Sequence, residues 1–379
     1  MLEESLTMTP GPTPVHPRIL EALARPTMAH GAPAFVEAFR VALADFQALC
    51  RTGTGQPFAV SGGGTLAMEM AVVNLVAPGE RLLVVSHGHF GDRFRELAGS
   101  FGIHAEVLAA PWGRAAAPEE LARALAGGPF KAVTVTHVDT STGTAAPVAD
   151  YAEILRGRPE LVILDGVCAT GGMDERFDEW GVDVLLTAPQ KAIGAPPGLA
   201  LCAFSQRAME VRRAMPAVPA YYADVLRWLP VMADPAKYFS TPCVNGILAL
   251  AEALRLLHQE GIQERFARHG RLARAMRAGL EVLGLAPFTA AGCRADTLSV
   301  VLLPPGVEEQ ALRGQVAARG VAVAGGLGPL AGKALRIGHM GNIAAGEVAQ
   351  TLLALEGALT ALGHPTLQGG ALAAAGPWL

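Results

Sequence analysis

Two isolated charges in the middle of the chain, Asp165 and Lys191, have the clearest potential for chemistry. Asp165 closes the apolar run LVILD, and Lys191 follows the next run, VDVLLTAPQ. Both runs are typical of buried strands, so each charge should lie at a strand end beside a covered sheet. A charge in such a place is costly unless a partner meets it. The spacing therefore predicts a binding site between the two residues.

A run of three glycines, Gly62–Gly64, joins a predicted strand at residues 56–60 to a predicted helix that opens at Thr65. Glycines let backbone N–H groups approach an anion, and a helix N-terminus carries a partial positive charge. The turn favours a bound phosphate, although a tight turn without a ligand would have the same sequence.

Nucleotide binding is the alternative for this turn. Gly62, Gly64 and Ala67 fit the GxGxxA pattern, but the next apolar run ends in Ser86 and lacks the acidic residue that would hold a ribose. A phosphate-binding loop at residues 332–334 is also poorly supported, because the required first glycine and the final Ser or Thr are missing.

The glycine turn, Asp165 and Lys191 together match the needs of pyridoxal 5'-phosphate (PLP). Its flat ring requires a lysine for a Schiff base, an acid to keep the pyridine nitrogen protonated, and an anion-binding turn for the phosphate. Each feature alone has an ordinary structural explanation, such as a helix cap or a solvated loop lysine. Their combination predicts PLP as the cofactor.

Seven short apolar runs must form the framework that holds these residues. They are residues 56–60, 81–86, 105–109, 132–137, 161–165, 182–187 and 199–204. Because several are apolar on both faces and alternate with helical segments, we expect an α/β fold with a mainly parallel sheet. Such a sheet binds ligands at the carboxyl ends of its strands.

The C-terminal third has a different pattern. A long helical stretch from Val244, interrupted at Gly261, leads to a smaller α+β arrangement. We predict a large domain at residues 1–250, which includes the N-terminal segment, and a bridging helix with a small domain at residues 251–379. The Ala- and Gly-rich tail after Gly363 predicts weak order.

Composition narrows the class of protein. The 379 residues are 51% hydrophobic and 17% charged, which excludes a disordered chain and favours self-association. The net charge of -4 disfavours nucleic-acid or membrane partners, and no apolar run approaches the ~20 residues that span a bilayer. The N-terminal MLEESLTM lacks a signal pattern, so we expect a cytoplasmic protein.

Metal and disulfide chemistry are not indicated. The five cysteines are scattered and never form CxxC, and the ten histidines show no HExxH spacing.

Eight motifs, in order from Thr9 to about Gly341, resemble the class V, fold type I aminotransferases, most closely the alanine:glyoxylate and serine:pyruvate group. They are TPGPTP, SGGGTLAME, GHFGDR, THVDTSTG, LDGVCATGG, DVLLTAPQKAIGAPPG, YFSTP and GGLGPLAGKALRIG. The resemblance implies a PLP enzyme whose large domain has a mainly parallel seven-stranded sheet and whose small C-terminal domain is α+β.

The resemblance also implies roles for the reactive residues. Lys191 would bind PLP as a Schiff base and transfer the proton between the substrate carbon and the cofactor. Asp165 would pair with the protonated ring nitrogen. Arg336 would bind the substrate α-carboxylate through its planar guanidinium; a surface ion pair is the alternative.

Further positions around the ring follow from the same resemblance. Phe90, where the family usually has Trp, and Val167 would cover the two faces of the ring. Thr140 and Gln190 would form hydrogen bonds near its phenolic oxygen.

The phosphate would be held from two sides. Backbone groups at Gly63, Gly64 and Thr65 would bind it, and the family often has His at the Thr65 position. Tyr238 and Thr241 would reach it from the neighbouring subunit of a homodimer; a core aromatic is the alternative for Tyr238.

The expected reaction transfers an amino group from alanine or serine to glyoxylate or pyruvate, because no second cation can be assigned to a distal acidic group. Aspartate, aminoethylphosphonate, pyridoxamine or ureidoglycine are alternative donors. A cysteine desulfurase is a weaker alternative, since the loop VAVAGGLGPLAG has no cysteine. A non-enzymatic PLP protein and a nicotinamide-dependent enzyme are the remaining possibilities.

Overall fold

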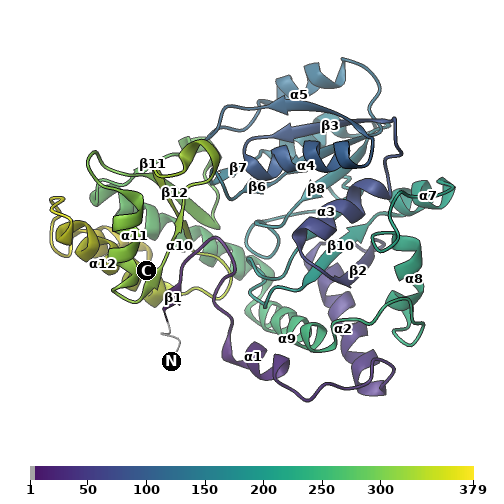
Figure 1. Ribbon diagram of the computed structural model, residues 1–379, viewed down its shortest axis with the longest axis horizontal. Coiled ribbons are helices and arrows are strands. Elements are labelled where there is room, and N and C mark those ends of the chain that lie inside the picture. The colour runs from purple at the N-terminus through teal and green to yellow at the C-terminus, as the bar shows by residue number, and fades with distance from the viewer. Residues whose placement is uncertain (1–4) are drawn as a thin grey trace.

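A seven-stranded sheet forms the centre of the larger hydrophobic core (Figure 1). The computed structural model describes residues 5–379, so Met1–Glu4, the first half of the MLEESLTM segment, lie outside the described residues. The strands are β2 (Gln56–Ser61), β3 (Arg81–Ser86), β4 (His104–Ala109), β5 (Ala132–Thr136), β8 (Leu161–Asp165), β9 (Val184–Thr187) and β10 (Leu199–Phe204). All seven predicted strands are therefore confirmed.

The strand order is β2-β10-β9-β8-β5-β3-β4. Only β10 runs antiparallel to its neighbours, and the other pairs in the sheet are parallel. Every residue of β5, β8, β9 and β10 is buried, as their continuous apolar runs require, whereas the edge strand β4 is partly exposed. The predicted α/β class with a mainly parallel sheet is confirmed.

Helices on both faces cover this sheet (Figure 1). They are α1 (Pro17–Leu23), α2 (Pro33–Leu49), α3 (Gly64–Val73), α4 (His89–Ser100), α5 (Pro118–Leu125), α6 (Val148–Leu155), α7 (Gln206–Ala214), α8 (Val225–Ala233) and α9 (Val244–Glu260). The short strands β6 (Val138–Asp139) and β7 (Thr144–Ala145) form a hairpin after β5.

The second core surrounds a four-stranded antiparallel sheet in the order β11-β12-β15-β14. Its elements are α10 (Ile262–Val282), β11 (Ala286–Pro287), β12 (Leu298–Leu302), α11 (Glu309–Ala317), β13 (Val321–Ala322), β14 (Ala324–Gly325), β15 (Ala334–Gly338), α12 (Ala345–Ala361) and α13 (Gly370–Ala375). Short 3-10 turns occur at Ala291–Cys293, Gly328–Leu330 and Gly376–Trp378.

The two cores are joined by the α9–α10 connection and by the N-terminal segment. α9 and α10 meet at Gly261, whose φ of 90° lets the chain turn between the helices. At the N-terminus, β1 (Leu6–Thr7) pairs with β13, and Met8 packs in the second core. A domain boundary at residue 250 stays a prediction.

The expectation of a weakly ordered tail was wrong. α13 packs against α10, and Ala371 is fully buried. Small residues let α13 approach α10 closely. A Cβ on Gly279 of α10 would lie only 3.1 Å from the carbonyl oxygen of Ala371 in α13. Within the described residues, no helix combines the length and apolarity that crossing a bilayer requires.

Candidate active site

A cavity of about 160 Å³ lies at the carboxyl ends of β5, β8 and β9. Its lining residues are Gly64, Thr65, Met68, Phe90, Arg93, Val138, Thr140, Asp165, Val167, Cys168, Gln190 and Lys191. Eight residues predicted for the site are among them, so the structure brings most of the predicted cofactor-binding set together. Gly63, Tyr238, Thr241 and Arg336 are not among the lining residues.

Asp165 ends β8 and is buried at the cavity. Its Oδ1 accepts a hydrogen bond from the backbone N–H of Val167 at 2.9 Å. Burial raises the pKa of the carboxyl group to about 7, and the nearby acids Asp139 and Glu175 act in the same direction. A cationic partner would stabilise the ionised carboxylate of Asp165. No cation lies within ion-pair distance of it among residues 5–379.

Lys191 lies in a turn after β9, and its Nζ donates to the carbonyl of Pro10. The N-terminal TPGPTP segment therefore lies against the lysine. Gly11 has a φ of 114°, and a Cβ there would come within 2.8 Å of Lys191 side-chain atoms. Burial lowers the pKa of the amine, and the charge of Arg336 also contributes to this decrease.

The predicted phosphate turn forms the start of α3. Gly63 is the N-cap, and no side chain caps this helix. Gly62 has a φ of 155°, and a Cβ at Gly63 would meet nothing within 4 Å. The first N–H groups of α3 therefore form an open anion-binding end beside the cavity.

Phe90 stands in the first turn of α4, which the 139–141 segment caps. Asp139 Oδ2 accepts hydrogen bonds from the backbone N–H groups of Phe90 at 2.8 Å and Gly91 at 3.1 Å. Ser141 Oγ accepts from the N–H of His89 at 2.9 Å. Sequence reasoning missed Asp139, although its place beside Thr140 was a signal.

Arg336 on β15 reaches toward the cavity from the second core. Its Nε donates to the Gly325 carbonyl at 2.7 Å, and Nη1 donates to the Thr140 carbonyl at 3.3 Å. Among residues 5–379 it has no carboxylate within ion-pair distance. The surface ion pair that was the alternative is therefore absent from the described part of the chain.

Tyr238 and Thr241 lie away from the cavity of their own chain. Both are exposed, and Tyr238 is 63% exposed with its ring 5.7 Å from that of His30. The alternative of a core aromatic at Tyr238 is wrong.

Three groups in and beside the cavity lack partners that a PLP molecule could supply. Asp165 lacks a cation, the first turn of α3 lacks a cap, and Gln190 Oε1 has no hydrogen-bond partner among the described residues. A protonated pyridine nitrogen, a phosphate and a polar ring substituent would meet these needs. No cluster of potential metal ligands occurs in residues 5–379.

Comparison with known proteins agrees with this chemistry. The family model for class V aminotransferases matches residues 34–336. The chain belongs to the class V aminotransferase family. PLP is the cofactor of this aminotransferase, and the residues that line the cavity fit it.

Relatives of this class V aminotransferase match over nearly its whole length. An uncharacterised aminotransferase of Methanocaldococcus jannaschii is 36% identical, with 97% of this chain and 96% of the relative covered. The L-aspartate--glyoxylate aminotransferase of Paracoccus denitrificans is 30% identical, with 99% and 96% covered. The pyridoxamine--pyruvate transaminase of Mesorhizobium japonicum is 32% identical, with 98% and 95% covered.

Solved structures of the same group also superpose closely. The ureidoglycine-glyoxylate aminotransferase of Bacillus subtilis has a TM-score of 0.95 at 29% identity, with 99% of this chain and 97% of that chain covered. The alanine--glyoxylate aminotransferase of Nostoc sp. has a TM-score of 0.92 at 32% identity, with 95% and 96% covered. Their names specify different donors, so membership of the family leaves the donor open.

Arg93 is a cavity residue of this aminotransferase that sequence reasoning did not assign to the site, and Cys168, expected to pack beside the cofactor, also lines the cavity. The Arg93 guanidinium lies 4.8 Å from the centre of the Phe90 ring. Burial raises the pKa of the Cys168 thiol to about 11, which disfavours a reactive thiolate. The motif GHFGDR, which contains Arg93, was the available signal for that residue.

Proposed function

We propose that this aminotransferase transfers an amino group from alanine or serine to glyoxylate or pyruvate in two half-reactions. The relation between Arg336 and Lys191 carries the proposal. Among residues 5–379 Arg336 has no carboxylate partner; it binds the carbonyl of the cavity residue Thr140, and its charge acts on the Lys191 amine. A small amino acid whose carboxylate binds Arg336 would thus present its α-carbon near Lys191.

Lys191 is the proposed acid and base. Its Nζ has a pKa lowered by burial, so a larger share of the amine is neutral and able to accept the proton from the substrate α-carbon. The same nitrogen returns the proton to the cofactor side. Bound PLP supplies an electron sink, and the Asp165 carboxylate keeps its ring nitrogen protonated.

The remaining predicted residues orient and hold the cofactor. Phe90 and Val167 cover the ring, while Thr140 and Gln190 bind its polar edge. Backbone N–H groups of Gly63, Gly64 and Thr65 bind the phosphate at the open end of α3.

A homodimer completes the proposed site. Tyr238 and Thr241 are exposed in their own chain, and Tyr221 in the same region is 67% exposed. Exposed aromatic residues favour a protein interface. In this arrangement Tyr238 and Thr241 of each subunit contact the phosphate bound by the other.

Arg93 favours a second candidate, transfer from a dicarboxylic donor such as aspartate. It is a cation on the cavity wall, and it has no carboxylate within ion-pair distance among residues 5–379. A guanidinium in this place could bind a distal carboxylate. The ratio of kcat/KM for L-aspartate to that for L-alanine, measured in wild type and Arg93→Met, distinguishes the two candidates.

The visible spectrum of the holoenzyme tests the reaction. With L-alanine or L-serine the band of the bound cofactor should bleach, and glyoxylate or pyruvate should restore it. Lys191→Ala should lose this cycle. A band in the wild-type protein that responds to none of these amino acids would contradict the proposed donors, and a response to L-aspartate alone would favour the second candidate.

A further inference from the structure

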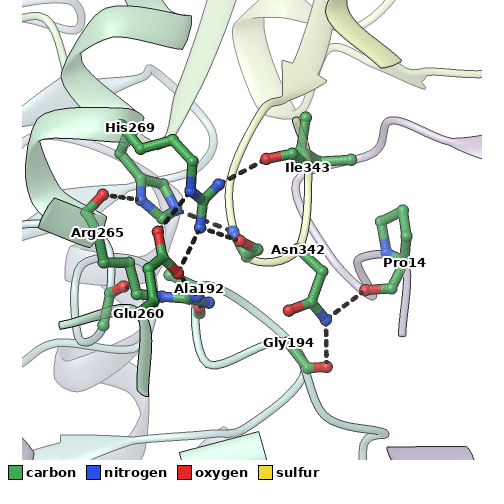
Figure 2. Close-up of polar contacts among 11 residues, drawn as sticks. Pro14, Ala192, Gly194, Glu260, Arg265, His269, Asn342 and Ile343 are labelled. Carbon is green, nitrogen blue, oxygen red and sulfur yellow. Dashed lines mark hydrogen bonds and ion pairs between the residues drawn. The ribbon is translucent and has the colours of Figure 1, made fainter. Parts of the chain in front are cut away.

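A largely buried cluster of charged and polar side chains contacts the turn that carries Lys191 (Figure 2). It consists of Glu260 at the end of α9 and Arg265, Arg268 and His269 in the first two turns of α10. Arg265 is 3% exposed and His269 is fully buried. Buried ion pairs contribute little net stability, because desolvation offsets their attraction, so stability alone is a weak explanation for this cluster.

Arg265 joins the loops that follow the two central residues of the site. Its Nη2 donates to the carbonyl of Ala192 at 2.7 Å, and its Nε donates to the carbonyl of Gly171 at 2.9 Å. Ala192 follows Lys191 directly, and Gly171 lies in the loop that begins at Asp165. One rigid guanidinium therefore spans the backbones of both loops.

The rest of the cluster connects Arg265 to the end of β15. Glu260 accepts from Arg265 Nη1 at 2.6 Å and from Arg268 Nε at 2.6 Å. Arg268 also donates to the carbonyls of Gly341 at 3.0 Å and Ile343 at 2.5 Å. These carbonyls lie shortly after Arg336 in the chain.

His269 links α10 to the same segment through its two ring nitrogens. The backbone N–H of Gly341 can only donate, so His269 Nε2 accepts from it at 3.0 Å. Nδ1 is then the protonated nitrogen and donates to the carbonyl of Arg265 at 2.7 Å. The ring is thus neutral, with one defined tautomer.

Two further contacts clamp the Lys191 turn. Thr13 Oγ1 donates to the carbonyl of Lys191 at 2.9 Å. Asn342 Nδ2 donates to the carbonyls of Gly194 at 2.9 Å and Pro14 at 3.1 Å (Figure 2). The turn is therefore held by the N-terminal segment, by α10 and by the loop after β15.

We propose that Arg265 is a positioning residue that holds Lys191 and Asp165 in their relative places. Glu260, Arg268 and His269 tie this arrangement to the segment after Arg336. The inference rests on the proposed function, because it gives a common anchor to three residues that act on the substrate or on the cofactor. Arg265 acts through backbone carbonyl groups and touches neither cofactor nor substrate.

The test compares Arg265→Met and Arg265→Lys with Arg277→Met. Arg277 is a matched control, since it also lies in α10 and bonds a carbonyl, that of Ala295 at 3.0 Å, and a carboxylate, that of Asp296 at 3.3 Å. The first readout is the pH midpoint of the reaction between apoprotein and pyridoxal, with Lys191→Ala as the blank. The second is kcat of the holoenzyme.

We expect Arg265→Met to move the pH midpoint upward, because a loosened turn exposes the Lys191 amine to water. A displacement of about 1 Å should also lower kcat by about 100-fold. Arg265→Lys should show a smaller shift of the midpoint and a smaller loss in kcat. Lysine keeps the positive charge but lacks the several fixed N–H donors of the guanidinium. Arg277→Met should lose thermal stability without a change in the midpoint.

The proposal is overturned if the Arg265 variants lose stability as the control does yet keep the wild-type midpoint and kcat. If Arg265→Met does not fold, Arg265→Lys decides by the same two readouts. A wild-type holoenzyme that transfers no amino group would refute the proposed function, whereas the midpoint comparison on apoprotein would still decide the role of Arg265.

Discussion

The carboxylate of Asp139 accepts a hydrogen bond from the backbone N–H of Phe90 at 2.8 Å. An acid from the hairpin after β5 thus caps the helix that carries the proposed ring-stacking residue. Asp139→Asn should weaken PLP binding by about 10-fold, because an amide gives a weaker cap and removes a charge-assisted hydrogen bond. Fluorescence titration of the apoprotein with PLP measures this affinity. An affinity equal to that of the wild type would contradict the prediction.

Arg336→Lys should raise KM for both amino acid and oxo acid by about 10- to 100-fold, since lysine cannot form the paired hydrogen bonds of a guanidinium. The spectrum of bound PLP should stay the same, because Arg336 is not among the residues that line the cavity. Steady-state kinetics checks the first point. If Arg336→Lys keeps the KM values of the wild type, Arg336 does not bind the substrate.

The stability of the apoprotein should depend on pH through Asp165. Burial raises the pKa of its carboxyl group from 3.8 to about 7, so the folded state binds the proton more tightly than the unfolded state. The resulting stabilisation is fully present at pH values below the pKa of Asp165 in the unfolded chain. It is lost as the pH rises through the pKa of Asp165 in the folded protein. Relative to wild type, Asp165→Asn should therefore gain in Tm as the pH rises from about 4 to about 7. A constant Tm difference would contradict this.

Mixing two inactive variants should restore activity if the site is shared between subunits. Lys191→Ala and Tyr238→Ala each damage both sites of their own homodimer. A mixed dimer contains one site with an intact Lys191 and an intact Tyr238 from the other subunit. After random exchange of subunits, about a quarter of wild-type activity is expected. Light scattering of tagged subunits verifies that the subunits have exchanged. If activity does not recover after verified exchange, the site is not shared between subunits.

Much of the fold was predictable because buried parallel strands leave a strong sequence pattern. The seven runs, the strand-end position of Asp165 and the place of Lys191 shortly after the next strand could be assigned for this reason. α13 was missed, because its Ala and Gly residues give no amphipathic signal and their burial depends on close contact with α10.

The supporting contacts of the site were less predictable. Asp139 and Arg265 bind backbone groups of distant segments, and such contacts have no characteristic spacing in the sequence. Arg93 had a place in a recognised motif, but only the folded chain shows it on the cavity wall. The sequence alone identifies reactive side chains more readily than the groups that hold them.

The contact of the TPGPTP segment with Lys191 has a consequence for biosynthesis. β1 lies just before this segment and pairs with β13, which follows it in the sequence by more than three hundred residues. The strand pairing that anchors this segment, which carries the Pro10 carbonyl bound by Lys191, can therefore form only after β13 has been translated. In a nascent chain the site around Lys191 therefore lacks this anchor until part of the second core has been made.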